Sequence, residues 1–430
     1  MKLTFRGGAH EVGRSCIEVH THQSYSMLDC GIKLGEDGTE LPFLPQNLHE
    51  LDAVFLSHAH LDHSGALPIL EHRGYEGPIF ATKATKEITK ILLRDAFKIG
   101  RLHQDIMPYD ENDISKALGF MRRVKIDEQG KIKDLHYKFF RAGHIPGSAS
   151  VMLKADKRKI LYTGDIKYQD TRLMPGADTD YFMEDNDSPV DALITEATYG
   201  NREHPNREAE EKRFIRRIQQ TVDNNGSVMV PVFALGRAQE IMLLIQENMN
   251  KMGCPVYIDG MATKINKIVM ENPGSIKDPK KLAKAMSMIK SVRSQQHRKQ
   301  IMNEQGVFIT TSGMLTGGPI ISYLKRFHKG SSNSILLTGY QGEHTNGDLL
   351  LKRKQVYLDG WRTGVKCHVD QFDFSAHAGL SELKKIAKDS RADTLIVQHG
   401  DKAEVDNLAE WGRALDFKVY TPDIGDVIRL

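Results

Sequence analysis

The stretch that decides the fold is SHAHLDHSGA, residues 57–66, which begins at the last residue of the strand-like run LDAVFLS (51–57). Within six positions it places His58, His60, Asp62 and His63. Side chains at alternate positions of an extended chain share a direction, so His58 and His60 can converge on one point. Asp62 and His63 come where the chain turns into a helix and can face a second point beside the first. Imidazole and carboxylate groups are zinc ligands, so the stretch predicts a metal site rather than a cluster of surface histidines.

Two other strand ends carry residues that can complete such a site. RAGHIPGSAS places His144 at the end of a predicted strand, among small residues that permit close approach, and KILYTGDI places Asp165 at the end of another. A carboxylate at Asp165 can bridge two metal ions. Asp29 ends the strand-like run SMLD and is predicted to orient a metal ligand. Taken singly, such residues are more typical of hydrogen-bonded structural positions, and the cluster at 58–63 reverses that preference.

The composition fits a globular protein that is too long for one ordinary core. The chain has 430 residues, of which 40% are hydrophobic and 27% are charged. No apolar run reaches the length of a membrane span, and the N-terminus lacks the apolar core of a signal peptide. The four cysteines are scattered without a CxxC pair, which favours reduced thiols and a cytoplasmic protein. The net charge of +3 is too small to indicate a polyanionic partner by itself.

The order of predicted elements indicates two kinds of structure. Short strands dominate the first 200 residues, with a predicted helix at ATKEITKILLRDAFKIG (84–100), and strands return near residue 367. Between them, helices and strands alternate, as in REAEEKRFIRRIQQTVDNN (207–225) followed by SVMVPVF (227–233). This alternation predicts a parallel sheet with helices on its faces.

The chain resembles the metallo-β-lactamase superfamily and, within it, the β-CASP nucleases. Asp29, the HxHxDH block at 58–63, His144 and Asp165 match the superfamily in order and context. Three later motifs are typical of the β-CASP branch: Glu196 in DALITEATYGNREH (motif A), His377 in FDFSAHAGLSEL (motif B) and His399 in TLIVQHGD (motif C). Together with GRAQE (236–240), TSGMLTGGP (311–319) and GYQ (339–341), they make the chain similar to archaeal proteins related to the cleavage and polyadenylation specificity factor nuclease.

The resemblance implies an α/β architecture, an αββα metallo-β-lactamase sandwich with an inserted β-CASP α/β domain. The sandwich is expected from residues 1–199 and 366–430, and the β-CASP domain from residues 200–365. The sequence begins in the first predicted strand, so we expect it to lack the KH domains of some archaeal relatives.

The resemblance also implies a role for each motif residue. Two zinc ions per chain are expected, one held by His58, His60 and His144, the other by Asp62, His63 and His399, with Asp165 as the bridge. The expected catalytic residues are Asp62, Glu196 and His377. His377 is expected to protonate the departing oxygen while Glu196 holds its other ring nitrogen. The expected contacts to RNA phosphates are Arg237, Ser312, Gly313 and Met314.

The implied activity is zinc-dependent hydrolysis of single-stranded RNA, in RNA processing or decay, leaving 5′-phosphate and 3′-hydroxyl ends. His399 favours RNA, because DNA-directed relatives usually carry valine in motif C. The wording FSAHA in motif B is similar to the cleavage-factor type and favours an endonuclease. A 5′→3′ exonuclease of the ribonuclease J type stays open as the alternative.

Two further alternatives and one partner follow from the sequence. A small-molecule metallohydrolase would not explain motifs A to C, and a non-catalytic RNA-binding scaffold would not explain a complete set of metal ligands.

The C-terminal segment DFKVYTPDIGDVIRL (416–430) is predicted to end in an edge strand. Such an edge can pair in a homodimer or simply complete the sheet.

Overall fold

The computed structural model describes residues 1–35, 38–103, 107–179 and 189–430. The backbone groups into two compact units. The first comprises Met1–Asp170, Gly176–Glu203 and His377–Leu430, and the second comprises Thr171–Pro175 and His204–Ala376. The domain boundaries expected after residues 199 and 365 stay a prediction.

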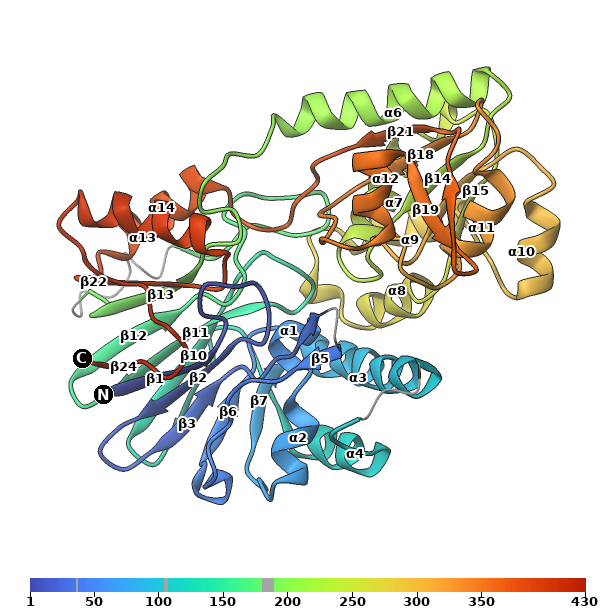
Figure 1. Cartoon of the computed structure of the whole chain (residues 1–430). Helices are drawn as coiled ribbons and strands as arrows, with labels where there is room; N and C mark the ends of the chain where they lie inside the picture. The colour runs from blue at the N-terminus through green and yellow to red at the C-terminus, as the bar shows by residue number, and fades with distance from the viewer. Residues whose placement is uncertain (36–37, 104–106, 180–188) are drawn as a thin grey trace. The chain divides into compact units, whose positions relative to one another are not determined.

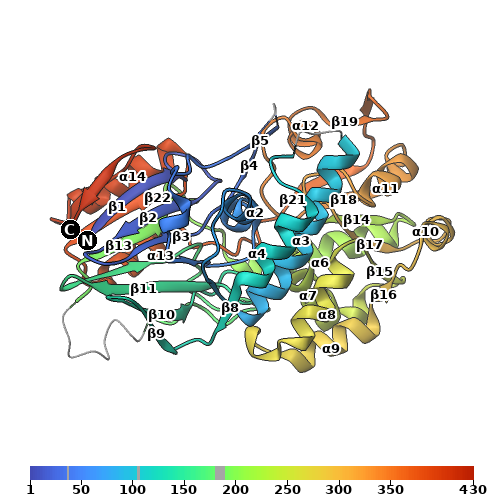
Figure 2. The ribbon, with the colours of Figure 1, turned by 90° about the horizontal axis from the view of Figure 1, so that it is seen from below.

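Two seven-stranded sheets form the middle of the first unit (Figure 1, Figure 2). One sheet has the order β24 (Val427–Arg429), β1 (Lys2–Gly7), β2 (Cys16–His20), β3 (Tyr25–Leu28), β6 (Ala53–Phe55), β7 (Ile79–Thr82), β8 (Met121–Val124). The other has the order β23 (Lys418–Tyr420), β22 (Thr394–Gln398), β13 (Ala192–Glu196), β12 (Arg158–Tyr162), β11 (Ala149–Ala155), β10 (Leu135–Arg141), β9 (Gln129–Ile132). A short hairpin of β4 (Lys33–Gly35) and β5 (Gly38–Glu40) lies outside both sheets.

The two sheets face each other across one hydrophobic core. Alternate residues of each strand point to this core, because the side-chain period of a strand is two. Leu3 and Phe5 of β1 are fully buried in it together with Val151 and Leu153 of β11. The intervening positions of both sheets point the other way, where helices cover them.

Helices cover the outer face of each sheet, as Figure 1 shows for α13 and α14. The first sheet packs against α2 (Leu67–His72), α3 (Lys83–His103) and α4 (Glu111–Phe120), preceded by the short helix α1 (Leu61–Ser64). The second sheet packs against α13 (Leu380–Ser390) and α14 (Lys402–Arg413). The layers therefore run helix, sheet, sheet, helix, which confirms the predicted αββα sandwich.

The second unit is built on a six-stranded sheet whose recorded strand pairings are all parallel. Its order is β16 (Lys290–Ser291), β15 (Val256–Asp259), β17 (Val307–Thr310), β14 (Val228–Pro231), β18 (Ser334–Leu337), β21 (His368–Gln371). Val228 and Val230 face one hydrophobic core, and Met229 between them faces another. Because both faces are buried, this is the helix-covered parallel sheet that the alternation of elements predicts.

The helices of the second unit pack on both faces of its sheet. One face carries α6 (Arg207–Asp223), α7 (Arg237–Glu247), α8 (Ala262–Glu271) and α9 (Pro279–Met288). The other carries α10 (Gln295–Ile301), α11 (Ile320–Phe327) and α12 (Asn346–Arg353). Asn206 caps α6, since its side chain accepts a hydrogen bond from the N–H of Ala209 at 2.9 Å.

The described helices show no membrane-spanning segment. Across the four described ranges, no helix combines the length and the apolar character needed to cross a bilayer. Even α3, with 21 residues, carries charged side chains along its length.

Candidate metal centre

Polar residues gather where five strands of the first unit end. β3 runs parallel to β6, and β12, β13 and β22 run parallel to one another, so the carboxyl ends within each group lie at one edge of their sheet. The polar residues at or just after these ends are Asp29, His58, Asp165, Glu196 and His399. Asp29 and His399 adopt left-handed backbone conformations, with φ of 56° and 51°, which are uncommon for residues other than glycine. The backbone is therefore bent specifically at these positions.

The first group of side chains that can hold a metal ion consists of His58, His60, His144 and Asp165. One ligand atom from each lies within 4.8 Å of all the others. His144 Nε2 lies 3.1 Å from His60 Nδ1, and His58 Nε2 lies 3.4 Å from Asp165 Oδ2. Three imidazoles and one carboxylate thus converge on one point.

The second group consists of Asp62, His63, Asp165 and His399. His63 Nε2 lies 3.2 Å from Asp165 Oδ1 and 3.4 Å from His399 Nε2. Asp62 Oδ2 lies 3.6 Å from His399 Nε2. Asp165 turns Oδ2 to the first group and Oδ1 to the second, so a single carboxylate joins the two.

Unsatisfied atoms show that these residues fit a cation. His58 Nε2 and Asp165 Oδ1 are buried, and neither makes a hydrogen bond within the described part of the chain. A buried polar atom without a partner is costly, and a metal ion supplies the missing one. Nitrogen and oxygen donors in these numbers are the set that zinc prefers.

Electrostatics favour the metal-binding forms of His58, His60 and Asp165. Burial lowers the pKa of His58 and His60, so both imidazoles are neutral and present a lone pair. Burial opposes ionisation of Asp165, yet the imidazoles of His63 and His399 hold the pKa of that carboxyl well below its usual range. The carboxylate that the two groups share is therefore ionised at neutral pH.

Asp29 anchors the ligand His63 from behind. Its Oδ2 lies 2.7 Å from His63 Nδ1 and accepts hydrogen bonds from Ser57 Oγ at 2.6 Å and Tyr162 OH at 2.7 Å. Its Oδ1 accepts the N–H of Ser57 at 2.7 Å. With Nδ1 held in this way, His63 directs Nε2 toward Asp165. That Asp29 orients a metal ligand stays a prediction.

Ser57 and Tyr162 contact residues of the site and are not among the residues predicted from the sequence. Ser57 Oγ also lies 3.0 Å from Nδ1 of His58, so one serine contacts two members of the site. Tyr162 is fully buried, and Ser15 Oγ lies 3.1 Å from its hydroxyl. The available signal is a polar residue at the end of an otherwise apolar strand, next to a predicted ligand.

His377 and Glu196 form a pair beside the shared carboxylate. His377 Nδ1 lies 2.9 Å from Glu196 Oε2 and 3.9 Å from Asp165 Oδ2. The N–H of Ile166 donates to Glu196 Oε1 at 2.7 Å and fixes the carboxylate. Burial opposes the charged imidazole, but Glu196 and Asp165 raise the pKa of His377 to about 9. His377 therefore carries a proton at neutral pH.

The predicted phosphate contacts lie in the second unit. Arg237 starts α7, and its guanidinium donates a hydrogen bond to the carbonyl of Phe374. Ser312 Oγ accepts the N–H groups of Thr316 at 3.1 Å and Gly317 at 3.3 Å, so it shapes its own loop. In the described ranges, the N–H groups of Gly313 and Met314 donate no hydrogen bond. Phosphate binding at these four residues stays a prediction.

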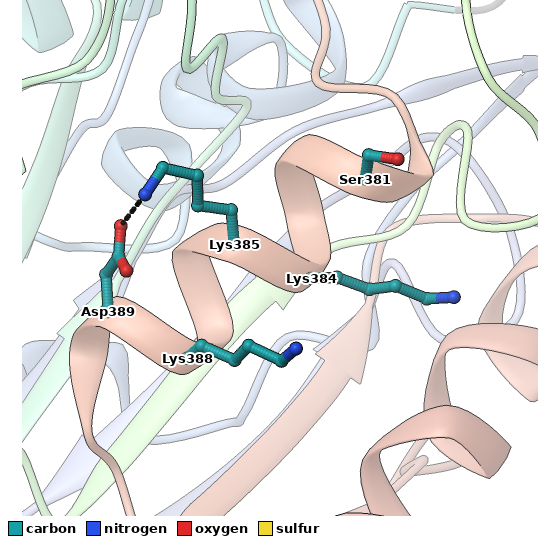
Figure 3. A pocket seen from close by; sticks show the side chains of 5 residues that line it. All are labelled: Ser381, Lys384, Lys385, Lys388 and Asp389. Atoms are coloured by element: carbon teal, nitrogen blue, oxygen red, sulfur yellow. Dashed lines mark hydrogen bonds and ion pairs between the residues drawn. The ribbon is translucent and has the colours of Figure 1, made fainter.

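A surface hollow on α13 does not include any member of the metal groups. Figure 3 shows its lining side chains along one side of the helix: Ser381, Lys384, Lys385, Lys388 and Asp389. Lys385 and Asp389 form an ion pair at 3.0 Å. The chemistry of the histidine and aspartate groups is therefore separate from this hollow.

Comparison with known proteins places this geometry in a family. Three family models match: the metallo-beta-lactamase superfamily domain at residues 19–198, the Beta-Casp domain at 238–350, and the Zn-dependent metallo-hydrolase RNA specificity domain at 362–422. "Probable RNase MJ4" from Methanocaldococcus jannaschii is 40% identical over 435 residues, covering 100% of both chains. The chain belongs to the metallo-β-lactamase/β-CASP family of ribonucleases.

Two more relatives agree with this placement. "RNase aCSPSF2" from Saccharolobus solfataricus is 32% identical over 431 residues, which are 100% of this chain and 85% of the relative. A crystal structure of a protein of unknown function from Enterococcus faecalis V583 has a TM-score of 0.62 and 16% identity, covering 100% of this chain and 99% of that one. At 16% identity, the similarity to the Enterococcus faecalis structure shows only that the two chains share a fold.

Family membership confirms the resemblance seen in the sequence. The enzyme is a zinc-dependent β-CASP ribonuclease of the archaeal cleavage-factor-like type. The residues that the structure brings together around Asp165 give it a cluster suited to metal. This sets aside the alternatives of a small-molecule metallohydrolase and a non-catalytic scaffold.

Proposed function

We propose that this zinc-dependent ribonuclease cuts single-stranded RNA internally at a centre of two zinc ions, leaving 5′-phosphate and 3′-hydroxyl ends. The observation that carries the proposal is the position of Asp165. One of its oxygens faces each ligand group, with His58 Nε2 at 3.4 Å and His63 Nε2 at 3.2 Å. A carboxylate placed in this way is suited to bridge two ions.

The ligands divide into the two sets that the sequence predicts. His58, His60 and His144 would hold one ion, and Asp62, His63 and His399 the other. When bound, zinc lowers the pKa of water toward neutrality and offsets negative charge on the phosphate. The protein's contribution is to hold the ligands in place, through Asp29 behind His63 and through Ser57 beside His58.

His377 supplies the proton that the departing oxygen needs. Glu196 occupies its Nδ1 at 2.9 Å, so the proton available for transfer is the one on Nε2. The carboxylate of Glu196 also stabilises the charged imidazole, so that His377 is protonated before it acts. Glu196 is thus assigned a positioning role, and His377 the role of general acid.

The glycine-rich loop at 311–319 is suited to hold a phosphate of the substrate strand. Two consecutive N–H groups, those of Gly313 and Met314, have no hydrogen-bond acceptor among the described residues. Ser312 fixes the loop from within, and Arg237 adds a cation in the same unit. Free N–H groups on a fixed loop bind anions.

A circular single-stranded RNA, tested beside its linear 5′-monophosphate form, distinguishes the two modes of cleavage. An endonuclease cuts the circle, because it needs no chain end. A chelator should abolish cleavage of both forms. An intact circle, with steady release of mononucleotides from the linear RNA, would assign 5′→3′ exonuclease activity instead. The wording of motif B supports the endonuclease.

We also propose a homodimer that pairs through the C-terminal edge strand. β24 lies at the end of its sheet, and the neighbour recorded for it among the described strands is β1. Its other edge carries backbone groups that can pair with a second copy. Light scattering that shows a monomer at micromolar concentration would remove this proposal.

We also propose a cytoplasmic location. The four cysteines are free thiols, which supports it.

A further inference from the structure

The turn that follows β13 carries a tyrosine beside the proposed proton donor. Tyr199 lies just beyond Glu196, in the stretch EATYGNREH (196–204). The centre of its ring is 5.9 Å from that of His377, and the two rings make an angle of 73°. Arg202 lies over the same tyrosine ring, with Cζ 4.3 Å from the ring centre. All of these residues belong to the first unit, except for the last residue of the stretch.

Three side chains limit the orientation of the His377 ring. Glu196 Oε2 lies 2.9 Å from its Nδ1, and the ring of His144 lies 4.4 Å away at an angle of 53°. A contact at Nδ1 alone lets the ring tilt about that atom, so contacts with the ring itself decide where Nε2 points. Aromatic rings that meet edge to face have a preferred geometry, and Tyr199 supplies such a contact. His144 is already assigned to a zinc ion, whereas Tyr199 has no assigned role.

The backbone that carries Tyr199 is fixed against α14. The N–H of Gly200 donates to the carbonyl of Ala197 at 2.9 Å, and Asn407 Nδ2 donates to the carbonyl of Gly200 at 2.7 Å. A Cβ atom at Gly200 would come within 2.4 Å of the carbonyl oxygen of Glu404, so only glycine lets the turn approach the helix this closely. The tyrosine ring therefore extends from a rigid turn.

The same turn is tied to the loop that carries His377. The N–H of Leu380 donates to the carbonyl of Arg202 at 3.0 Å. The N–H of Ala378 donates to the carbonyl of Ile166 at 2.7 Å, which fixes the loop next to His377 itself. The two rings thus start from backbones that are held together, so their contact costs little conformational entropy when it forms.

We propose that Tyr199 is a positioning residue for the general acid: its ring, held by Arg202, keeps Nε2 of His377 directed at the departing oxygen. The proposal rests on the role of His377 in the proposed function and adds a residue to it. During cleavage, the bond between phosphorus and the 3′ oxygen breaks, its electron pair stays on the oxygen, and the proton of His377 Nε2 moves to that oxygen. Because the proton is transferred only within hydrogen-bond reach, a tilted ring slows this step and leaves RNA binding unchanged.

An RNA with one sulfur atom isolates this step. In a single linkage of a single-stranded RNA, sulfur replaces the 3′ oxygen that departs. When the bond between phosphorus and sulfur breaks, the electron pair stays on sulfur as a thiolate, which needs no proton because thiols are much stronger acids than alcohols. Gel electrophoresis compares cleavage at this linkage with cleavage at the same linkage of the unmodified RNA. The comparison measures how much of the rate depends on proton delivery.

Loss of the tyrosine ring should affect the oxygen linkage alone. Tyr199→Leu should lower kcat for the oxygen linkage by roughly 10–100-fold with KM unchanged, the cost of a small displacement of a reacting group. Its kcat for the sulfur linkage should equal that of the parent. Tyr199→Phe keeps the ring and should match the parent on both linkages. The matched control is Tyr420→Leu, since Tyr420 is also half-buried in the first unit, with Lys418 Nζ 5.2 Å from its ring centre, and it should lose no turnover.

Two results in Tyr199→Leu would overturn the proposal: equal losses of kcat on the two linkages, or no loss on either. Arg202→Ala gives a second test that does not depend on the folding of Tyr199→Leu. It removes the cation that holds the ring, so it should cause a smaller loss of kcat, again confined to the oxygen linkage. Equal losses on both linkages in Arg202→Ala would also overturn the proposal.

His377→Ala, measured on the same two RNAs, separates this proposal from the proposed function. Sulfur should restore its turnover, because the missing proton donor is then not needed. If sulfur restores turnover in His377→Ala but not in Tyr199→Leu, only the role of Tyr199 is wrong. If sulfur fails to restore turnover in His377→Ala, the general acid of the proposed function is wrong, and the role of Tyr199 is wrong with it.

Discussion

Asp165 of the first unit and Asp259 of the second are both buried aspartates beyond or at the end of a sheet strand, yet their surroundings differ. The carboxylate of Asp259 accepts hydrogen bonds from Arg298, from Nε at 2.5 Å and from Nη2 at 3.0 Å. It also accepts one from the hydroxyl of Tyr323 at 2.9 Å. Asp165 faces imidazole nitrogens, and its Oδ1 makes no hydrogen bond within the described residues. One carboxylate is satisfied by the chain itself, and the other is not.

The difference separates a structural buried charge from a functional one. Arginine is always protonated, so the negative charge of Asp259 is balanced at every relevant pH. Burial holds His58 and His60 neutral, so neither of these neighbours balances the charge of Asp165 as arginine balances that of Asp259. Substitution at each of the two sites should therefore affect a different property, metal content at one and stability at the other.

The largest expected effect follows from removing the shared carboxylate. Asp165→Ala should lose much of the zinc that the parent enzyme binds, because both ligand groups lose a member. RNA hydrolysis should fall by more than the ~100-fold that loss of a group behind a ligand costs. Zinc analysis by mass spectrometry beside an RNA cleavage assay checks this. Asp389→Ala, which removes a carboxylate from the α13 hollow, serves as control. Full zinc content in folded Asp165→Ala would contradict the binuclear assignment.

Substitution of His377, the proposed proton donor, should separate chemistry from metal binding. His377→Ala should keep zinc and RNA affinity and lose turnover by roughly 10²–10⁴-fold, the usual contribution of a general acid. The matched control is His72→Ala, since His72 Nδ1 also lies 2.9 Å from a carboxylate, that of Asp113, but its side chain is 58% exposed. That control should turn over normally. Near-normal turnover in His377→Ala would mean that the proton comes from elsewhere, and the role of Glu196 would fall with it.

In the second unit, Arg298→Ala removes the partner of Asp259. This substitution should lower the stability of the protein and leave its zinc content unchanged. The substitution leaves Asp259 buried without its cation, which typically costs ~3–5 kcal/mol. Urea unfolding of the second unit, followed together with zinc content, measures both properties. Lys281→Ala breaks an exposed ion pair with Glu247 at 3.1 Å and should cost less than ~1 kcal/mol. A loss in Arg298→Ala no larger than in this control would show that Asp259 is satisfied in some other way.

The contrast also explains what the sequence could predict. His58, His60, Asp62 and His63 fall within six residues, so their convergence follows from local geometry. The parallel sheet of the second unit follows from the regular alternation of helices and strands. His399 is different: it meets His63 across 336 residues, and only the family motif places it in the site.

Other contacts leave no trace in the local pattern. Asp259 and Arg298 pair across 39 residues, and neither stands in a run that marks it. Tyr162 reads as one more apolar residue of β12, although its hydroxyl contacts Asp29 across 133 residues. Side-chain pairs of this kind depend on how sheets and helices pack, which periodicity does not encode.

The smallest expected effect lies behind the metal ligands, where the two kinds of buried charge meet in one residue. Asp29 is fully satisfied, like Asp259, yet its Oδ2 contacts Nδ1 of His63, a proposed zinc ligand. Asp29→Asn keeps the shape but replaces one acceptor oxygen by a donating NH₂. Three donors converge on Oδ2 and one on Oδ1, so either orientation of the amide sets a donor against a donor. His63 then loses its charged partner, and zinc affinity should fall by about 10–100-fold.

The control variant, Tyr162→Phe, removes only one of these donors. That hydrogen bond contributes a net ~0.5–1.5 kcal/mol, so its loss should weaken zinc binding several-fold at most. Competition with a zinc chelator of known affinity measures both variants against the parent. Equal affinities in Asp29→Asn and Tyr162→Phe would mean that the carboxylate charge does not orient His63, and that Asp29 belongs with Asp259 as a structural residue.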